Sequence, residues 1–433
     1  MPAPDFRASV SPVVASPVLR RLLPAFALSA VGDGMSAVGV AWLAIAIAAP
    51  ADRGLTVGLA VAAYTLPGAA GAVVLSRPLR ALAARHLVAA DAIVRTVTLS
   101  VIPLLYACGA LRAGSLVALL AASSVLHAWG LSGQYTLVAK HLPAEHRTAG
   151  NAVLSGVGMA AFIIGPLLAG LAVAAAGPAM PVAADAASFA ILAVAAATTR
   201  SQPRATGPEE AGQPPRARGF GTIARSKPLA GLLGLTVAYY FLYGPVEVAL
   251  PLYVTGSLHG NAGLLSLFWT VFGIGATAGS IAAAVTRRFP VWPVLMAAVI
   301  GWGAALTPLG LIRLPVPALA CFAFGGLLYA PYPAVSATVF QRESPPHLLS
   351  QVLAARGALT VLATPLGAAL GGPLTAWLGA QHTLLASAGA TIATGLAATA
   401  VLTRRRGQQT RPQASRAART ARSRSSEYAR NPL

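Results

Sequence analysis

Twelve long apolar runs dominate this sequence and limit what it can fold into. Each is close to or above the roughly 20 residues that a helix needs to cross the hydrocarbon core of a bilayer. Polar segments separate the runs, and only one of these segments is long. The expected spans cover residues 22–49, 55–76, 87–108, 114–138, 151–176, 179–199, 229–256, 261–286, 291–312, 315–339, 351–377 and 380–403.

The same runs exclude a soluble domain and a membrane β-barrel. Only 10% of the residues are charged and the mean hydropathy is +0.70, whereas soluble proteins carry about 25% charged residues. Backbone groups in lipid must bond within the protein, which leaves helices or closed barrels. The runs lack the alternation of barrel strands. The sequence therefore predicts an all-α polytopic membrane protein with twelve transmembrane helices.

The formal net charge of +20 follows the expected topology. If the N-terminus is cytoplasmic, only Arg53, Arg112 and Arg313 of the 31 Lys and Arg residues fall in the outer loops. Because cytoplasmic loops carry an excess of Lys and Arg, we expect a multi-pass protein of the plasma membrane with both termini in the cytoplasm. No folded domain offers the basic face that nucleic acid would need, so we expect no nucleic-acid partner.

The residues give no support to cofactor or enzyme chemistry. Cys108 and Cys321 lie in or beside spans and form neither a disulfide framework nor a metal-ligand spacing. The spans contain no nucleophile with a plausible His and acid, and the chain has no Gly-x-x-x-x-Gly-Lys-Ser/Thr phosphate loop. We therefore expect no metal, no cofactor and no enzymatic activity.

One long polar connection divides the spans into six and six. Residues 200–228 are rich in Pro, Gly and Arg, which is typical of a flexible linker. The predicted organisation is a cytoplasmic tail (1–21), a first six-helix half (22–199), this linker, a second six-helix half (229–403) and a basic, disordered cytoplasmic tail (404–433).

Similar segments recur in the two halves. The first contains "HRTAGNAVLSGVGMAAFIIGPLLAG" and the second "HLLSQVLAARGALTVLATPLGAALGG", so that His146 and Pro166 correspond to His347 and Pro365. Two similar halves joined by a long linker are typical of transporters that bind substrate between the halves and rock around it.

Several segments, in this order, resemble the major facilitator superfamily, and within it the twelve-span exporters of the siderophore and antibiotic secretion type. They are "SAVGDGMSAVGVAWLA", "AADAIVR", "LPAEHRTAGNAVLSG", "GPLLAGLAVAAAGP", "DAASFAI", "PLYV", "FGIGATAGS" and "PLGAALGGPL". The resemblance covers nearly all of residues 15–403. It implies a monomer and an exporting direction of transport.

Two departures from that family's pattern concern gating and coupling. In the family the loop after the second span reads Gly-x-x-x-Asp-Arg-x-x-Arg-Arg, but here Ser76 stands where the Asp would precede Arg77. The fourth span lacks the intramembrane Arg of many proton-coupled exporters and offers Ser123, Ser124 and His127 instead. Proton coupling must therefore be argued from other residues.

Asp33 is the leading candidate for a proton or cation site. It lies near the middle of the first span, flanked by Gly32 and Gly34, which thin the helix and let water or a partner helix approach. Its neighbours one turn away, at i±3 and i±4, include no basic residue. An unpaired carboxyl at this depth is suited to binding and releasing a proton during transport. The alternative is a carboxyl that is hydrogen-bonded to neighbouring helices.

Other charges within or beside the spans are assigned to structure and gating, with coupling as the alternative. Asp91 and Arg95 are four residues apart on one helix and can pair near the inner gate. Arg356 can snorkel or bond a carbonyl, and Arg77 belongs to the loop described above. Asp185 is a proton-coupling candidate whose alternative role is to anchor the sixth span at the outer interface.

Glu247 is the second coupling candidate, in "YYFLYGPVEVALPLY". Pro245 and Pro251 remove backbone donors around it and are expected to bend the helix, and interrupted helices mark transporter sites. The alternative is a Glu near the outer mouth in contact with water. Candidate cavity residues, each with helix packing as its alternative, are Tyr64, Trp129, Gln134, Tyr135, Tyr239, Tyr240, Tyr243, Phe268 and Trp269.

These features predict a secondary active transporter that exports a small amphipathic or hydrophobic molecule by proton antiport. The expected partners are that small-molecule substrate, protons and the lipid bilayer. The alternatives are an importer of the same fold and a membrane sensor or scaffold that transports nothing. The residues do not disclose the substrate.

Overall fold

A computed structural model describes residues 13, 15–79, 82–199, 216–286 and 289–404 of the chain. Within these ranges every assigned element is helical, and twelve helices are long and apolar enough to cross a membrane. The predicted all-α fold with twelve spans is therefore confirmed. The expected tails at 1–12 and 405–433 and the linker residues 200–215 lie outside the described residues.

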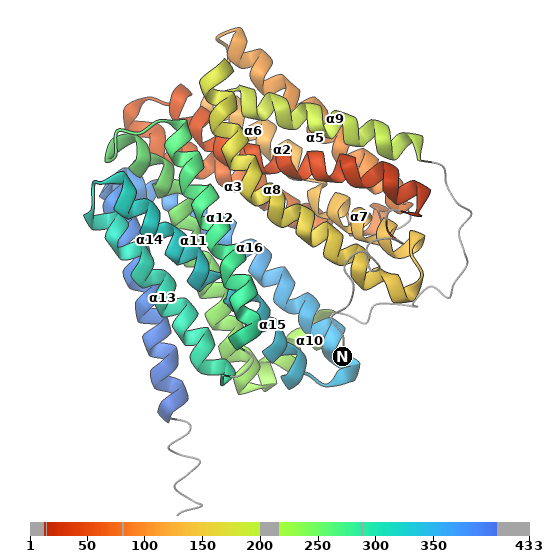
Figure 1. Cartoon of the computed structure of the whole chain (residues 1–433), viewed down its shortest axis with the longest axis vertical. Helices are drawn as coiled ribbons and strands as arrows, with labels where there is room; N and C mark the ends of the chain where they lie inside the picture. Colours follow the sequence, from red (N-terminus) through yellow and green to blue (C-terminus); the bar gives the residue numbers. More distant parts are fainter. Residues whose placement is uncertain (1–12, 14, 80–81, 200–215, 287–288, 405–433) are drawn as a thin grey trace, which may run out of the picture.

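The helices follow one another along the chain as a series of spans (Figure 1). The first six spans are α2 (Pro17–Ile47), α3 (Arg53–Val74), α5 (Ala84–Ala107), α6 with α7 (Ala113–Ser124 and His127–His141), α8 (Arg147–Ala176) and α9 (Met180–Thr198). The last six are α11 (Lys227–Gly256), α12 (Ala262–Thr286), α13 (Val291–Leu311), α14 with α15 (Pro315–Tyr329 and Pro331–Glu343), α16 (Leu349–Leu378) and Ala380–Arg404. Four short elements lie between them, η1 (Pro50–Asp52), α4 (Ser76–Leu79), η2 (Ala144–His146) and η3 (Pro346–Leu348).

Part of the segment expected to be a flexible linker is helical. Arg216–Arg225 form α10, and α11 already begins at Lys227. The buried side chain of Ile223 ties α10 to the core of the last six spans, and Gly219 lies against the carbonyl of Gln351 near the start of α16. We call the end of the bundle where α10 lies the linker end, and the opposite end the far end.

The core consists of two clusters of buried apolar side chains. One draws almost entirely on the first six spans and the other on the last six. Figure 1 shows the two sets on opposite sides of the molecule, the first in red to yellow-green and the second in green to blue. They meet where α3 packs on α16 and α8 packs on α12. Where the two predicted halves begin and end as domains stays a prediction.

The contacts between the two sets lie toward the far end. A Cβ on Gly58 of α3 would lie 2.7 Å from the Cα of Gly372 on α16, and one on Gly170 of α8 would lie 3.1 Å from the Cα of Gly263 on α12. Small residues allow such close approach of helices. Nearer the linker end of α8 and α16, Gly156 and Gly357 have no atom within 4 Å of a Cβ. The seam is therefore tight at the far end.

Two helix ends occupy equivalent places in the two repeats. α8 ends at Gly177 and α16 ends at Gly379, with φ of +89° and +80°. Left-handed backbone of this kind is favourable for glycine, which has no Cβ to clash, and it stops the helix. The matching ends agree with the repeat that the sequence indicates.

The fourth and tenth spans are each interrupted. The fourth divides between Ser124 and His127, and the tenth divides at Ala330. In contrast, α11 is a single helix through Pro245 and Pro251, so the prolines do not divide it, and the expected bend near Glu247 stays a prediction. Thr364 of α16 donates to the carbonyl of Tyr240 at 3.1 Å, which is one way a neighbouring helix supports the backbone in this region.

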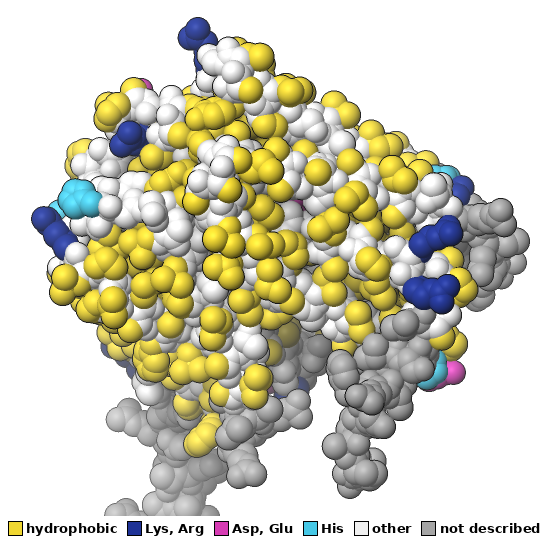
Figure 2. All heavy atoms as spheres, turned by 45° about the horizontal axis from the view of Figure 1, so that its top comes forward, with side chains coloured by type: hydrophobic (Ala, Val, Ile, Leu, Met, Phe, Trp, Pro, Cys, Tyr) yellow, Lys and Arg dark blue, Asp and Glu magenta, His cyan; other side chains and the backbone are white. Residues whose placement is uncertain are grey.

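The outer surface is apolar, as a lipid-facing surface must be. Leu171, Ile281 and Trp377 are 61%, 71% and 83% exposed. Figure 2 shows hydrophobic side chains over most of the visible face, with the Lys and Arg side chains near its margins. A soluble protein rarely exposes so much contiguous apolar surface, so this surface agrees with the membrane location.

Candidate functional site

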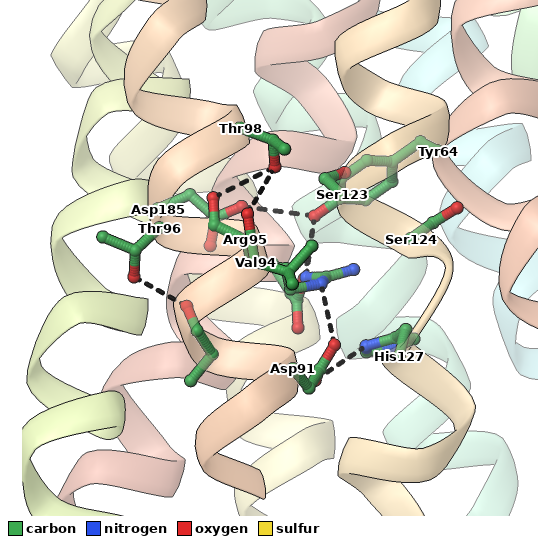
Figure 3. Close-up of polar contacts among 12 residues, drawn as sticks. Tyr64, Asp91, Val94, Arg95, Thr96, Thr98, Ser123, Ser124, His127 and Asp185 are labelled. Atoms are coloured by element: carbon green, nitrogen blue, oxygen red, sulfur yellow. Dashed lines mark hydrogen bonds and ion pairs between the residues drawn. The ribbon is translucent and has the colours of Figure 1, made fainter. Parts of the chain in front are cut away.

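A polar cluster of Arg95 of α5 and three carboxyl groups lies inside the first six spans, and Figure 3 shows Arg95 with two of these acidic residues, Asp91 and Asp185. Arg95 is 1% exposed. Its guanidinium forms an ion pair with Asp33 of α2 and lies 3.9 Å, Nε to Oδ1, from Asp91 on its own helix. The third carboxyl, that of Asp185 on α9, reaches the same cluster through Tyr64.

The expectation that Asp33 has no counter-ion is wrong. Asp33 pairs with Arg95, which also donates a hydrogen bond to it, and accepts a second hydrogen bond from the Tyr64 hydroxyl at 2.8 Å. The positions one helical turn away contain no base, as the sequence indicates, but the partner comes from another helix 62 residues along the chain. Asp33 remains 31% exposed, so water can still reach it.

Asp185 is buried in this cluster. Its carboxyl accepts hydrogen bonds from Ser36 at 2.6 Å and from Tyr64 at 3.2 Å. Gly32 makes this approach possible, because a Cβ there would lie 2.5 Å from Oδ1 of Asp185. The glycine beside Asp33 therefore admits a partner helix, as expected. The alternative of anchoring α9 at the outer interface does not account for these contacts.

The interruption of the fourth span places α7 against Asp91. His127 Nδ1 lies 3.9 Å from Asp91 Oδ2, and Gly130 packs so closely on this carboxyl that a Cβ would overlap it. Among the described residues, Asp91 Oδ1, Arg95 Nε and His127 Nδ1 are buried without a hydrogen-bond partner. Asp91 and Arg95 thus face each other as predicted, but at a distance that leaves both groups incompletely bonded.

Sequence reasoning missed several members of the cluster. Ser36 and Phe189 contribute a hydroxyl and a ring, the ring centroid lying 4.6 Å from the Arg95 guanidinium carbon. Tyr64, which the sequence suggests only as a cavity residue, joins Asp33 to Asp185. Ser36 could have been predicted as a neighbour of Asp33, because it lies one turn later on the same face of α2.

The other predicted charges lie elsewhere. Arg356 donates to Ser336 at 3.0 Å and lies over the ring of Phe340, which agrees with a structural role on α16 and α15. The side chain of Arg77 lies outside the described part of the chain. Glu247 of α11 is partly exposed, and within the described residues it has neither an ion pair nor a hydrogen-bond partner.

The predicted cavity residues divide by burial. Tyr239, Tyr243, Phe268 and Trp269 are at most 8% exposed and pack in the hydrophobic core of the last six spans, whereas Tyr240 is partly exposed. In the first six spans, Trp129 donates to the carbonyl of Gly71 at 3.1 Å and fastens α7 to α3. On the same helix Gln134 is partly exposed, and Tyr135 is 45% exposed.

The family model of the Major Facilitator Superfamily matches residues 22–292 and 232–433. The multidrug efflux pump Tap of Mycobacterium tuberculosis is 32% identical over 249 residues, an alignment covering 55% of this chain and 58% of that relative. Tap of Mycolicibacterium fortuitum is 26% identical over 400 residues, covering 86% of this chain and 92% of the relative. The chain thus spans little more than half the length of the tuberculosis protein in that alignment.

Solved structures share the fold. The nucleoside transporter NupG superposes with a TM-score of 0.72 at 14% identity, covering 89% of this chain and 99% of NupG. A D-xylose–proton symporter superposes with a TM-score of 0.66 at 12% identity, covering 91% of this chain and 97% of the symporter. Together with the family model, which covers nearly all of the spans, this likeness leads to one conclusion: the chain belongs to the Major Facilitator Superfamily.

Proposed function

We propose that the protein exports small amphipathic or hydrophobic molecules by proton antiport and alternating access. The relatives named multidrug efflux pumps support the exporting direction. The observation that carries the coupling proposal is the position of Tyr64, whose single hydroxyl contacts the carboxyls of both Asp33 and Asp185.

A hydroxyl has one proton to donate, but its oxygen can also accept a hydrogen bond. Tyr64 satisfies both contacts if it donates to ionised Asp33 and accepts from protonated Asp185. The charge balance supports the same assignment. Three carboxyls lie in one cluster with the single Arg95 guanidinium, and two of them, Asp91 and Asp185, are buried, where an excess negative charge is costly. A proton held within the cluster offsets that excess.

Moving this proton changes which helices are tied together. Ionised Asp33 holds Arg95 and so links α2 to α5. When Asp33 is protonated the ion pair weakens, and Arg95 turns toward Asp91, 3.9 Å away on its own helix. Two arrangements of one guanidinium form the kind of two-state element that a proton can bias. We place the coupling step at this exchange, with Asp33 as the proton carrier.

The tight far-end seam supports alternating access. With both termini in the cytoplasm, as the Lys and Arg distribution favours, the far end faces outward and the structure corresponds to an inward-facing state. Opening α3 from α16 and α8 from α12 at this seam gives the opposite state. The substrate is then bound between the first and last six spans. The protein acts as a monomer in the plasma membrane.

The test uses purified protein in liposomes with an imposed pH gradient and three dyes, Hoechst 33342, rhodamine 6G and Nile red. Antiport drives dye into the acidic compartment, whereas a proton symporter drives it into the alkaline one, so the direction separates export from import. Asp33→Asn abolishes gradient-driven flux with normal membrane insertion, and Asp52→Asn, at an exposed site, leaves it unchanged. Full proton-driven flux in Asp33→Asn protein would overturn the coupling proposal. Absence of gradient-driven movement of any of the three dyes would favour a sensor or scaffold.

A further inference from the structure

A layer of aromatic rings fills the middle of the last six spans. Tyr243, Trp302 and Tyr329 form a triangle whose ring centroids are 5.5 to 5.7 Å apart. Tyr239 stacks on Tyr329 with centroids 5.4 Å apart, and Phe272 lies against the same rings. The layer joins α11, α12, α13 and α14, which gives it a rigid backing.

Only part of this layer is accessible. Tyr239, Tyr243 and Trp302 are buried, whereas Tyr240, Tyr329 and Glu247 are partly exposed. Glu247 lies one turn after Tyr243 on the same face of α11, and its charge acts on the phenols of both Tyr243 and Tyr329. The accessible surface therefore consists of two phenol rings and one carboxyl.

The helix that carries Tyr240 and Glu247 is surrounded by other helices. α11 contacts α2 and α3 of the first six spans and α12, α15 and α16 of the last six. A helix with neighbours on all of these sides has little surface left for lipid. Tyr329 is also the last residue of α14, where the tenth span is interrupted. The partly exposed carboxyl and rings thus lie among helices of both sets and next to an interrupted helix, as in many transporter binding sites.

Glu247 differs from the carboxyls of the Arg95 cluster because the protein leaves it unpaired. Asp33 has a guanidinium and Asp185 has hydrogen bonds with two hydroxyls, but within the described residues no cation or hydrogen-bond donor contacts Glu247. A charged group in such a place is costly until a partner arrives. The rings beside Glu247 attract positive charge through their π-faces, but they carry no charge of their own that could neutralise the carboxylate.

We propose that Glu247, Tyr240 and Tyr329 bind the positive group of a lipophilic organic cation, with the carboxylate as its counter-ion and the phenol rings as its walls. The proposal rests on the transport function in one respect, since the bound cation is taken to be the cargo. It assigns cargo binding to the last six spans and leaves the proton to the Arg95 cluster in the first six.

Binding is measured on purified full-length protein in detergent by equilibrium dialysis with tetraphenylphosphonium, and with neutral triphenylphosphine oxide as its matched probe. Glu247→Gln is expected to weaken tetraphenylphosphonium binding by about tenfold or more, the usual scale for losing a charged partner. Binding of the neutral probe should stay unchanged. The matched control is Glu343→Gln, at an exposed position on α15. Equal affinity of Glu247→Gln and wild-type protein for the cation would overturn the proposal.

Two further measurements guard against a folding defect. Tyr329→Leu should lose affinity, and Tyr329→Phe, which keeps the ring, should retain it within about twofold. In wild-type protein, bound tetraphenylphosphonium should protect Glu247 from modification by dicyclohexylcarbodiimide, read by peptide mass spectrometry, and unprotected modification would contradict the proposal. Because binding in detergent needs no proton gradient, Glu247-dependent binding without dye flux would refute the proposed function and leave the cation site standing.

Discussion

Replacing Arg95 with Gln removes the guanidinium that lies among three carboxyl groups. Breaking a buried ion pair costs about 3–5 kcal/mol, because the remaining charge loses its partner. Arg95 is 1% exposed but Asp33 is 31% exposed, so water can hydrate part of the carboxylate left behind. We therefore expect a loss near the lower limit, about 3 kcal/mol in the free energy of unfolding.

A double-mutant cycle gives the sharper result. Asp33→Asn alone leaves Arg95 with Asp91 nearby, so its expected cost is smaller, about 1–2 kcal/mol. In the double variant position 33 carries no charge, so no unpaired carboxylate remains there. Its cost should therefore fall below the sum of the two single costs by about 1–3 kcal/mol.

The assay is reversible unfolding in mixed micelles by titration with sodium dodecyl sulfate, followed by tryptophan fluorescence. Arg313→Gln, at an exposed far-end position, serves as the control and should unfold like the wild type. If the single costs add to the double cost within about 0.5 kcal/mol, the two side chains are energetically independent. In that case the ion pair between Asp33 and Arg95 would neither stabilise the fold nor serve as the coupling step.

Two further predictions concern helix contacts. Gly130→Ala forces a Cβ into the Asp91 carboxyl and should lower gradient-driven dye flux. The control Gly156→Ala, where a Cβ meets nothing within 4 Å, should keep the wild-type flux. Equal flux in the two variants would show that the contact between Asp91 and α7 is unimportant for transport. Gly58→Leu puts a bulky side chain where a Cβ alone would lie 2.7 Å from the Cα of Gly372, so it should hold the seam apart and lower dye flux. Gly357→Leu, on α16 where a Cβ meets nothing within 4 Å, is the matched control, and wild-type flux in Gly58→Leu protein would contradict a moving seam.

Hydropathy made the spans predictable, because the need to satisfy the backbone in lipid leaves so few choices. It also pointed to Asp33, since a carboxyl in an apolar helix is conspicuous. The partner of Asp33 was not predictable from spacing, because an Arg side chain on α5 reaches it across helices. Local sequence reports which residues share a face of one helix, but not which faces of different helices meet.

The interruptions show the same limit. Pro245 and Pro251 lie inside the seventh span, yet they do not divide α11. In the fourth span, no proline marks the division before His127. There, Gly71 of α3 packs against Val125 at the division, so tertiary contact rather than local chemistry accompanies the break. Tight packing between helices can override or replace a proline signal.

The position of Asp91 one turn before Arg95 has a consequence for how the chain enters the membrane. An isolated Arg in a hydrophobic helix raises the free energy of insertion by about 2.5–3.5 kcal/mol. α5 carries the opposite charge on the same face, 3.9 Å from Nε in the folded protein. The third span can thus be inserted as an electrically balanced helix before α2 has packed beside it. Asp91 then serves as the counter-ion of the nascent helix, and the pairing with Asp33 follows when the bundle assembles.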